Sequence, residues 1–169
     1  MADPTSEFDQ YRDDILAALG DREPLAVLRA TFDEVRQLTA AVAADRLRRA
    51  PAAGEWSPWQ VLSHFADNDL VWGVRVRMVV TQDRPPLVPY DQEAWTARFG
   101  DLDIDPGDTL ARWQALRLSN LRLWDSLSAD EWQRTGLHPE RGELAVRTIV
   151  ELLAGHDRIH LEQMLRGLA

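Results

Sequence analysis

The chain has 169 residues, a length that suits one domain built around a single hydrophobic core. Apolar residues make up 45% and charged residues 28% of the sequence, which is typical of soluble globular proteins. The formal net charge of −9 disfavours nonspecific binding to nucleic acid or to anionic membranes, and no run of arginine marks a local basic patch. We therefore expect one domain over residues 1–169, in which residues 1–22 form an N-terminal extension.

The sequence contains no cysteine, so disulfides, a cysteine nucleophile and thiolate metal ligands are all excluded. Any metal ion must be held by histidine, aspartate, glutamate or water. The first 14 residues are acidic and lack the apolar core of a signal peptide, and no run is apolar enough to span a bilayer. These features make the cytoplasm the expected location.

Apolar residues recur at spacings of three and four, which predicts one short helix and four long ones. The short helix covers about residues 5–19, where Tyr11, Ile15 and Leu19 share a face. Strand signals are weak throughout, and residues 136–143 are predicted to form a loop. The long helices begin at Pro24, Pro58, Asp105 and Leu144, and their apolar stripes extend to about Arg49, Gln82, Trp124 and Leu168, respectively.

Several of these elements have recognisable start signals. Ser57 can cap the second long helix, Pro58 suits its first helical position, and Gln60 completes a capping box. Asp105 precedes a proline in the same way at the third long helix. Residues 128–131 have the pattern of another capped turn.

The connection between the second and third long helices, about residues 83–105, is too long to join neighbouring antiparallel helices. It includes a possible short helix in the segment DQEAWTARF. A connection of this length predicts a crossover. The expected fold is therefore an all-α four-helix bundle with a long crossover connection, plus a short N-terminal helix.

Two histidines in the last helix form the most informative pattern in the chain. His156 and His160 lie four residues apart, and so share one face of the helix on adjacent turns. They continue an apolar stripe that faces the core, where two imidazoles can bind one transition-metal ion. If the fold brings His64 to this pair, three histidines form a metal site with open coordination positions. The alternative is a set of core histidines that bond to backbone groups or carboxylates.

Polar residues beside these histidines are candidates for supporting roles. Asp67 or Asn68, one turn after His64, can contact a ligand or bound water, and Asp67 is the candidate catalytic base. Gln163 is expected to point inward, whereas Asp157 is expected to form a surface salt bridge.

Three residues near predicted loops are candidates for the walls of a pocket. Trp59 and Trp95 have this position among the seven tryptophans, most of which are expected to pack in the core. His138 is interpreted as a loop residue that can line the mouth of the site.

Two segments carry a resemblance to a known family. The segment GEWSPWQVLSHFADND resembles the second helix of the DinB-like metalloprotein superfamily, which includes a maleylpyruvate isomerase branch. The segment GELAVRTIVELLAGHDRIHLEQ resembles the last helix of that family, which ends in an H-x-x-x-H pair. The resemblance implies a four-helix bundle in which His64, His156 and His160 bind one divalent ion, commonly zinc or nickel. It also implies a homodimer, since members are often dimeric.

Members of that superfamily with assigned chemistry include S-transferases that use low-molecular-weight thiols such as bacillithiol or mycothiol. The leading hypothesis is therefore a metal-dependent S-transferase that joins a small-molecule thiol to an electrophilic substrate. A metal-dependent hydrolase that uses Asp67 as its base is the enzymatic alternative. A metal- or ligand-binding module without catalysis and a purely structural bundle remain as further alternatives.

Overall fold

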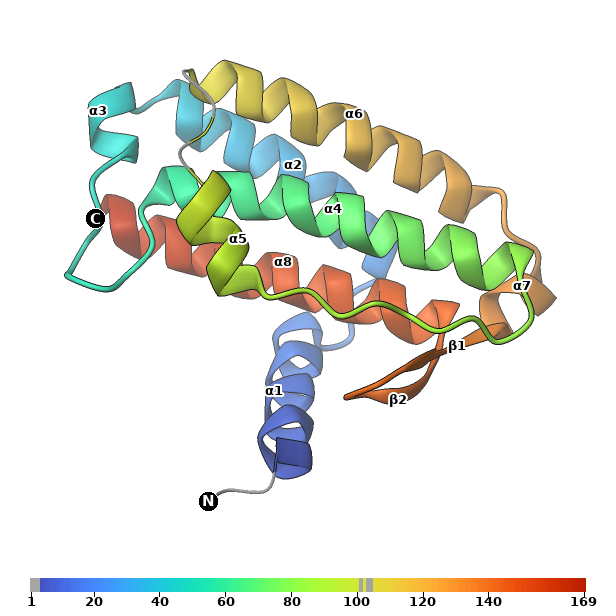
Figure 1. Cartoon of the computed structure of the whole chain (residues 1–169). Helices are drawn as coiled ribbons and strands as arrows, with labels where there is room; N and C mark the ends of the chain where they lie inside the picture. Colours follow the sequence, from blue (N-terminus) through green and yellow to red (C-terminus); the bar gives the residue numbers. More distant parts are fainter. Residues whose placement is uncertain (1–3, 101, 103–104) are drawn as a thin grey trace.

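The computed structural model describes residues 4–100, 102 and 105–169, with the side chains of the first helix described from Gln10 onward. Four long helices pack side by side as a bundle (Figure 1), which confirms the predicted all-α fold. The helices are α1 (Pro4–Leu19), α2 (Pro24–Ala40), α3 (Ala44–Leu47), α4 (Pro58–Thr81), α5 (Gln92–Phe99), α6 (Pro106–Asp125), α7 (Ala129–Gln133) and α8 (Val146–Leu168). A hairpin of two short antiparallel strands, β1 (Thr135–His138) and β2 (Gly142–Ala145), precedes α8.

The direction of the helices explains the long connection. The helices α4 and α6 run in the same direction, whereas α2 and α8 run the opposite way (Figure 1). The chain must therefore return along the whole bundle between α4 and α6, and α5 lies within this crossover. The short helix α1 packs against α8 and projects from the bundle. The crossover and the N-terminal helix are both confirmed.

The predicted start signals are present in the structure. The Ser57 hydroxyl accepts a hydrogen bond from the backbone N–H of Gln60, and the Gln60 side chain accepts one from the backbone N–H of Ser57. Asp105 caps α6 through the backbone N–H of Gly107. Ser128 caps α7 in a second capping box. Each cap satisfies backbone donors that a helix start leaves open, and a cap of this kind stabilises a helix by about 1 kcal/mol.

Two groups of buried apolar side chains hold the bundle together. One surrounds Phe65 and Trp113, whose rings stack with centroids 4.7 Å apart. The other surrounds Trp72 and Ile149 and extends to α1 through Ile15. Among the described residues, every helix is too short or too polar to serve as a membrane span.

A buried ion network lies between α4, α6 and α8. The Arg117 guanidinium donates to Asp69 at 2.8 Å and to Asp157 at 2.7 Å, and also to the backbone carbonyl of Leu28. Both carboxylates are inaccessible to solvent, so the expected surface salt bridge of Asp157 is wrong. The reason is that α8 packs against α1, α2 and α4, which leaves it little exposed face.

The first long helix is shorter than its apolar stripe predicts. It ends at Ala40 rather than near Arg49, and the chain turns before it forms α3. The Thr39 hydroxyl donates to the backbone carbonyl of Val35 at 2.9 Å, a local bond that competes with regular helix geometry. The alanine-rich stretch that follows has no glycine or proline to mark this end.

The predicted loop over residues 136–143 is also wrong, because most of it forms the hairpin. Leu137 lies in β1 and exchanges backbone hydrogen bonds with Pro85 and Leu87 of the crossover. Gly142 has φ of +68°, a conformation that favours glycine in the tight turn. Strands of four residues are too short to show a period of two, and part of their pairing comes from the distant crossover.

Candidate metal centre

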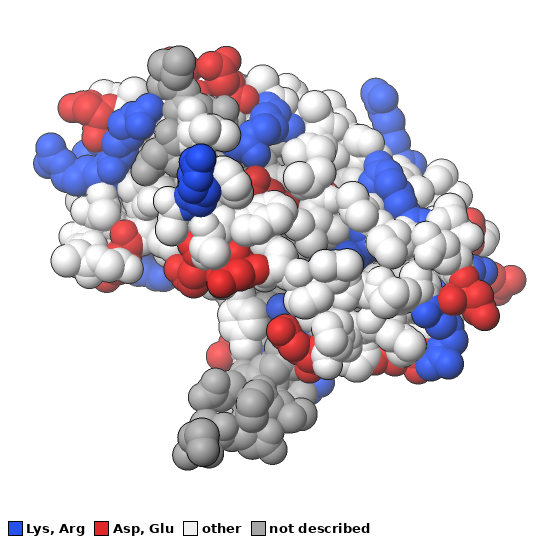
Figure 2. Space-filling view, viewed as in Figure 1, with Lys and Arg blue, Asp and Glu red and all other residues white. Residues whose placement is uncertain are grey.

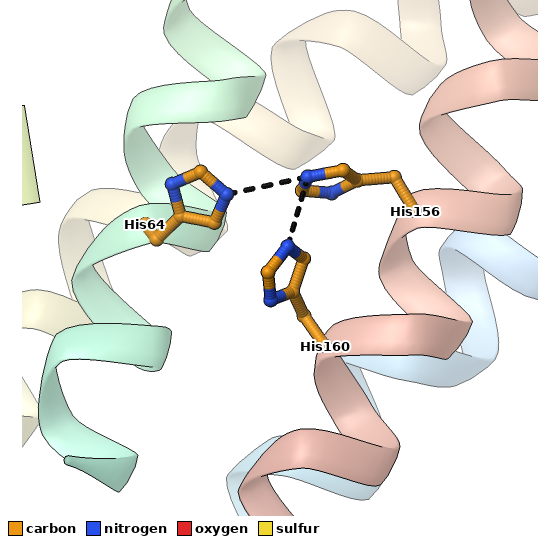
Figure 3. Close-up of side chains that lie close together, drawn as sticks. All are labelled: His64, His156 and His160. Atoms are coloured by element: carbon orange, nitrogen blue, oxygen red, sulfur yellow. Dashed lines mark hydrogen bonds between the residues drawn. The ribbon is translucent and has the colours of Figure 1, made fainter. Parts of the chain in front are cut away.

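Three histidine side chains meet inside the bundle. His64 comes from α4, whereas His156 and His160 come from adjacent turns of α8, and all three rings point toward one another (Figure 3). The Nε2 atom of His156 lies 3.3 Å from Nε2 of His64 and 3.0 Å from Nε2 of His160. The side chains are buried, and one ring nitrogen from each lies within 4.8 Å of the others. The fold therefore brings together the three histidines that the sequence singles out.

The spacing and charge of these nitrogens fit a divalent ion. Zinc–nitrogen bonds of 2.0–2.1 Å in a tetrahedral site place neighbouring nitrogens about 3.3–3.4 Å apart. Burial lowers the pKa of His64 and His156 well below the usual value, and that of His160 to about 4. All three rings are therefore neutral at pH 7. Without an ion, the ring N–H of one histidine hydrogen-bonds to the next across these distances, and a bound cation would take the place of that proton.

Gln163 orients one of the rings. Its side-chain oxygen accepts a hydrogen bond from Nδ1 of His160 at 2.7 Å. This bond places the ring proton on Nδ1 and leaves the Nε2 lone pair directed toward the other two histidines. The expectation that Gln163 points inward is confirmed.

Asn68 faces two of the histidines, and its orientation can be assigned. The indole N–H of Trp72 is only a donor, so the Asn68 atom at 3.2 Å from it is the oxygen, which also accepts from the Tyr90 hydroxyl. The amide nitrogen then lies 2.9 Å from Nε2 of His64 and 3.4 Å from Nδ1 of His156. Asn68 therefore competes with a metal ion for the His64 lone pair, and it links the site to the crossover.

Asp67, the other acidic candidate, is placed differently. Its carboxylate accepts a hydrogen bond from Arg112 of α6 at 3.1 Å, and Arg112 also donates to Ser63. Within the described part of the chain, the residues grouped as possible metal ligands are the three histidines without a carboxylate. The amide of Asn68 contacts two of the histidines.

Sequence reasoning misplaced the aromatic walls of the site. Trp59 is completely buried in the core under Arg48, so it cannot line an open pocket. Trp95 packs edge-on against Tyr90 and lines an apolar groove. The missed residue is Trp56, whose ring lies 4.8 Å from that of His64 and stacks on His160 at 5.8 Å. Its position just before the Ser57 cap, two turns before His64, is the signal that was available.

A cavity of about 260 Å³ opens beside the histidines. His156 and Asn68 form part of its wall, and other walls come from α1, from the crossover through Tyr90, and from the hairpin through His138. His138 therefore lines the approach to the site as predicted, although it lies at the end of a strand and is buried. Bundle helices supply the histidines, whereas the other segments shape the space next to them.

The sequence and the fold both match known proteins. A protein of Oceanobacillus iheyensis named "Putative metal-dependent hydrolase OB0782" is 28% identical over 117 residues, which is 69% of this chain and 67% of that protein. A Bacillus cereus protein with the name "Putative metal-dependent hydrolase" is 29% identical over 107 residues, 63% of this chain and 61% of its own length. The matches thus span about two thirds of these relatives or less.

Among solved structures, YfiT from Bacillus subtilis superposes with a TM-score of 0.78, over 85% of this chain and 83% of that one, at 23% sequence identity. YfiT is described as a probable metal-dependent hydrolase with an unusual four-helix bundle topology. At this identity the likeness establishes the fold. The sequence pattern of the DinB superfamily matches residues 27–164, a range that includes all three histidines, and the chain therefore belongs to the DinB superfamily.

Proposed function

We propose that His64, His156 and His160 bind one divalent metal ion, zinc or nickel, and that the protein is a metal-dependent S-transferase. The observation that carries the proposal is the convergence of three buried, neutral ring nitrogens at distances of 3.0 and 3.3 Å. Bound there, such an ion supplies Lewis acidity, which lowers the pKa of a coordinated thiol or water.

The residues around the histidines favour a thiol over water as the nucleophile. Three neutral ligands leave the charge of a divalent ion uncompensated, which favours an anionic fourth ligand, either thiolate or hydroxide. The chain has no cysteine, so the thiol must come from a small molecule, and an electrophilic substrate would occupy the adjacent cavity. Hydrolysis needs a base, and the Asp67 carboxylate is engaged by Arg112. We place this activity in the cytoplasm, where small thiols are kept reduced.

Hydrolysis is the second candidate, because the relatives from Oceanobacillus and Bacillus carry the name of metal-dependent hydrolases. In that reaction Asp67 would have to leave Arg112 to accept a proton. Turnover of an ester or amide without added thiol would favour this candidate. A protein that binds metal stoichiometrically but turns over neither class of substrate would be a binding module without catalysis.

Metal content measured by plasma mass spectrometry, on protein purified without a histidine tag, tests the site. We expect near-stoichiometric zinc or nickel in the wild type and its loss in His156→Ala, with His138→Ala as a matched control that keeps its metal. Loss of an electrophile that depends on both metal and added thiol would then support S-transfer. Absence of metal after incubation with zinc and nickel would overturn the proposal.

We also propose a homodimer, for which one surface is suited. Leu70 and Val74 of α4 and Val88 of the crossover are 44%, 49% and 69% exposed, around an apolar groove of about 400 Å³. Figure 2 shows few charged side chains over the middle of this face. Light scattering on Val74→Arg should give the mass of a monomer where the wild type gives that of a dimer. A monomeric wild type would contradict this part of the proposal.

A further inference from the structure

Two guanidinium groups converge at the cavity beside the histidines. Arg75 comes from α4 and Arg141 from the hairpin turn, and both line the cavity. Their central carbons lie 5.1 Å and 5.7 Å from the centre of the Trp72 ring. Arg75 is only 4% exposed, so most of its hydration is lost in the folded protein.

The contacts of Arg75 are with neutral groups, among them the Trp72 ring, and the acidic Glu140 acts on it only at a distance. Its Nη2 donates to the backbone carbonyl of Val88 at 2.8 Å, and its Nε has no hydrogen-bond partner among the described residues. No described carboxylate forms an ion pair with it. A buried cation without an anionic partner is costly, so an arrangement of this kind indicates a group that the protein chain itself does not supply.

His138 adds a further donor at the same place. Its Nδ1 accepts the backbone N–H of Glu140 at 3.3 Å, so in the neutral ring the proton lies on Nε2. That nitrogen is 3.4 Å from Nη2 of Arg75, so the two side chains meet at one point of the cavity wall. Burial and the two arginines lower the pKa of His138 to about 4, so the ring remains neutral at pH 7.

Burial and the charge of Arg141 also lower the pKa of Arg75, to about 10. Asp91 and Glu140 line the same cavity but are exposed, so water screens their charges, and Asp91 already caps α5. Their remaining negative charge repels a dianion more strongly than a singly charged anion, so the cavity favours the singly charged one. A planar guanidinium matches the two oxygens of a carboxylate.

We propose that Arg75, Arg141 and His138 bind a carboxylate group of the substrate, and thereby place its reactive end against the three histidines. The placement of the reactive end rests on the proposed S-transfer, whereas the recognition of the carboxylate is independent of it. The carboxylate can belong to the thiol or to the electrophile, and both sources share the same chemistry at this site.

Binding is tested with propionate and its neutral analogue propionamide, by calorimetric and NMR titration of tag-free protein, both metal-loaded and metal-stripped. We expect propionate to bind at least tenfold more tightly than propionamide in both forms. Arg75→Gln and Arg141→Gln should each weaken propionate binding about tenfold or more. Arg36→Gln, which removes the same charge from the exposed surface of α2, should change it by less than twofold.

Equal binding of propionate and propionamide, or unchanged binding in folded Arg75→Gln, would overturn the carboxylate site. If circular dichroism shows that Arg75→Gln does not fold, the half-buried Arg141 provides the deciding variant. Propionate binding without any thiol-dependent turnover would leave this site standing while the proposed S-transfer fails. Thiol-dependent turnover together with equal binding of propionate and propionamide would support the S-transfer and overturn the carboxylate site.

Kinetics then identify which substrate carries the carboxylate. One pair of electrophiles is iodoacetate and iodoacetamide, and one pair of thiols is 3-mercaptopropionate and 2-mercaptoethanol. Arg75→Gln should raise KM about tenfold for the charged member of one pair, with kcat and the KM of the neutral member little changed. Equal KM changes for charged and neutral members of both pairs would contradict the assignment.

Discussion

The side-chain oxygen of Gln163 lies 2.7 Å from Nδ1 of His160, one turn earlier on α8. Because this hydrogen bond fixes which ring nitrogen carries the proton, it directs the Nε2 lone pair of His160 toward His64 and His156. One turn of helix therefore holds both a proposed metal ligand and the group that orients it.

Removing this oxygen should weaken metal binding without unfolding the bundle. We expect Gln163→Leu to lower zinc affinity by roughly 10- to 100-fold, because His160 loses the acceptor that fixes its tautomer. Gln163→Glu keeps an acceptor and should bind zinc at least as tightly as the wild type. Competition with a chromogenic chelator measures both affinities. Equal affinities for the leucine and glutamate variants would show that the bond has no role in metal binding.

The metal-free protein should lose stability as the pH falls from about 6.5 toward 4. Burial lowers the pKa of His160 and of His138 to about 4, so the unfolded chain binds protons in this range before the folded chain does. His160 then costs up to about 3 kcal/mol, at 1.36 kcal/mol per pKa unit, and His138 costs less because water screens its charge. His64 and His156 act in the same direction. The stability that these neutral histidines contribute is fully present above about pH 6.5, the pKa of histidine in the unfolded chain.

Asp157 opposes this trend. Burial raises its pKa to about 6, so the folded chain takes up a proton before the unfolded chain does, and stability is gained as the pH falls from about 6 toward 4. Four histidines outweigh one aspartate, so we expect a net loss. Urea midpoints of chelator-treated protein at pH 7, 6 and 5 measure it. A midpoint that rises between pH 7 and 5 would contradict the assignment of neutral, buried histidines.

Breaking the buried ion network should strongly lower the free energy of unfolding. Arg117→Met leaves Asp69 and Asp157 without their shared cation inside the bundle, which should cost about 3–5 kcal/mol of unfolding free energy. The control Arg29→Met removes an exposed pair with Asp125 and should cost less than about 1 kcal/mol. Urea unfolding at pH 7 compares them. Similar losses in the two variants would mean that the network adds little to stability.

Gly155 should tolerate no side chain while α1 stays in place. A Cβ atom on Gly155 would overlap the backbone oxygen of Ile15, so Gly155→Ala must displace α1 from α8. Since Tyr11 of α1 lines the cavity, the variant should weaken propionate binding as well as stability. Hydrogen exchange over residues 10–19 reports the displacement. Unchanged protection there would contradict a tight contact between the two helices.

The sequence predicts most of the bundle, because its long helices carry long apolar stripes and clear caps such as that at Ser57. Their junctions are less predictable. The end of α2 at Ala40 has no sequence signal, and β1 depends on hydrogen bonds to the distant crossover. The local sequence pattern does not predict the structure of a segment whose hydrogen-bond partners lie far away in the sequence.

The candidate site shows the same division. A spacing of four predicts that His156 and His160 share a face, and the apolar stripe predicts that this face is buried. Nothing in the spacing shows that Asp157 meets Arg117, or that Arg75 lies beside a hairpin. Both relationships cross between elements that are far apart in the sequence. They therefore emerge only from the packed structure.

The histidines come from α4 and α8, whereas α1, the crossover and the hairpin enclose the space in front of them. Replacements or length changes in those outer segments would alter which molecules reach the histidines and leave the spacing of the ring nitrogens intact. Evolution can therefore change which small molecules such a protein accepts without changing the cluster of three histidines. Two chains with the same three histidines are a poor guide to each other's substrates.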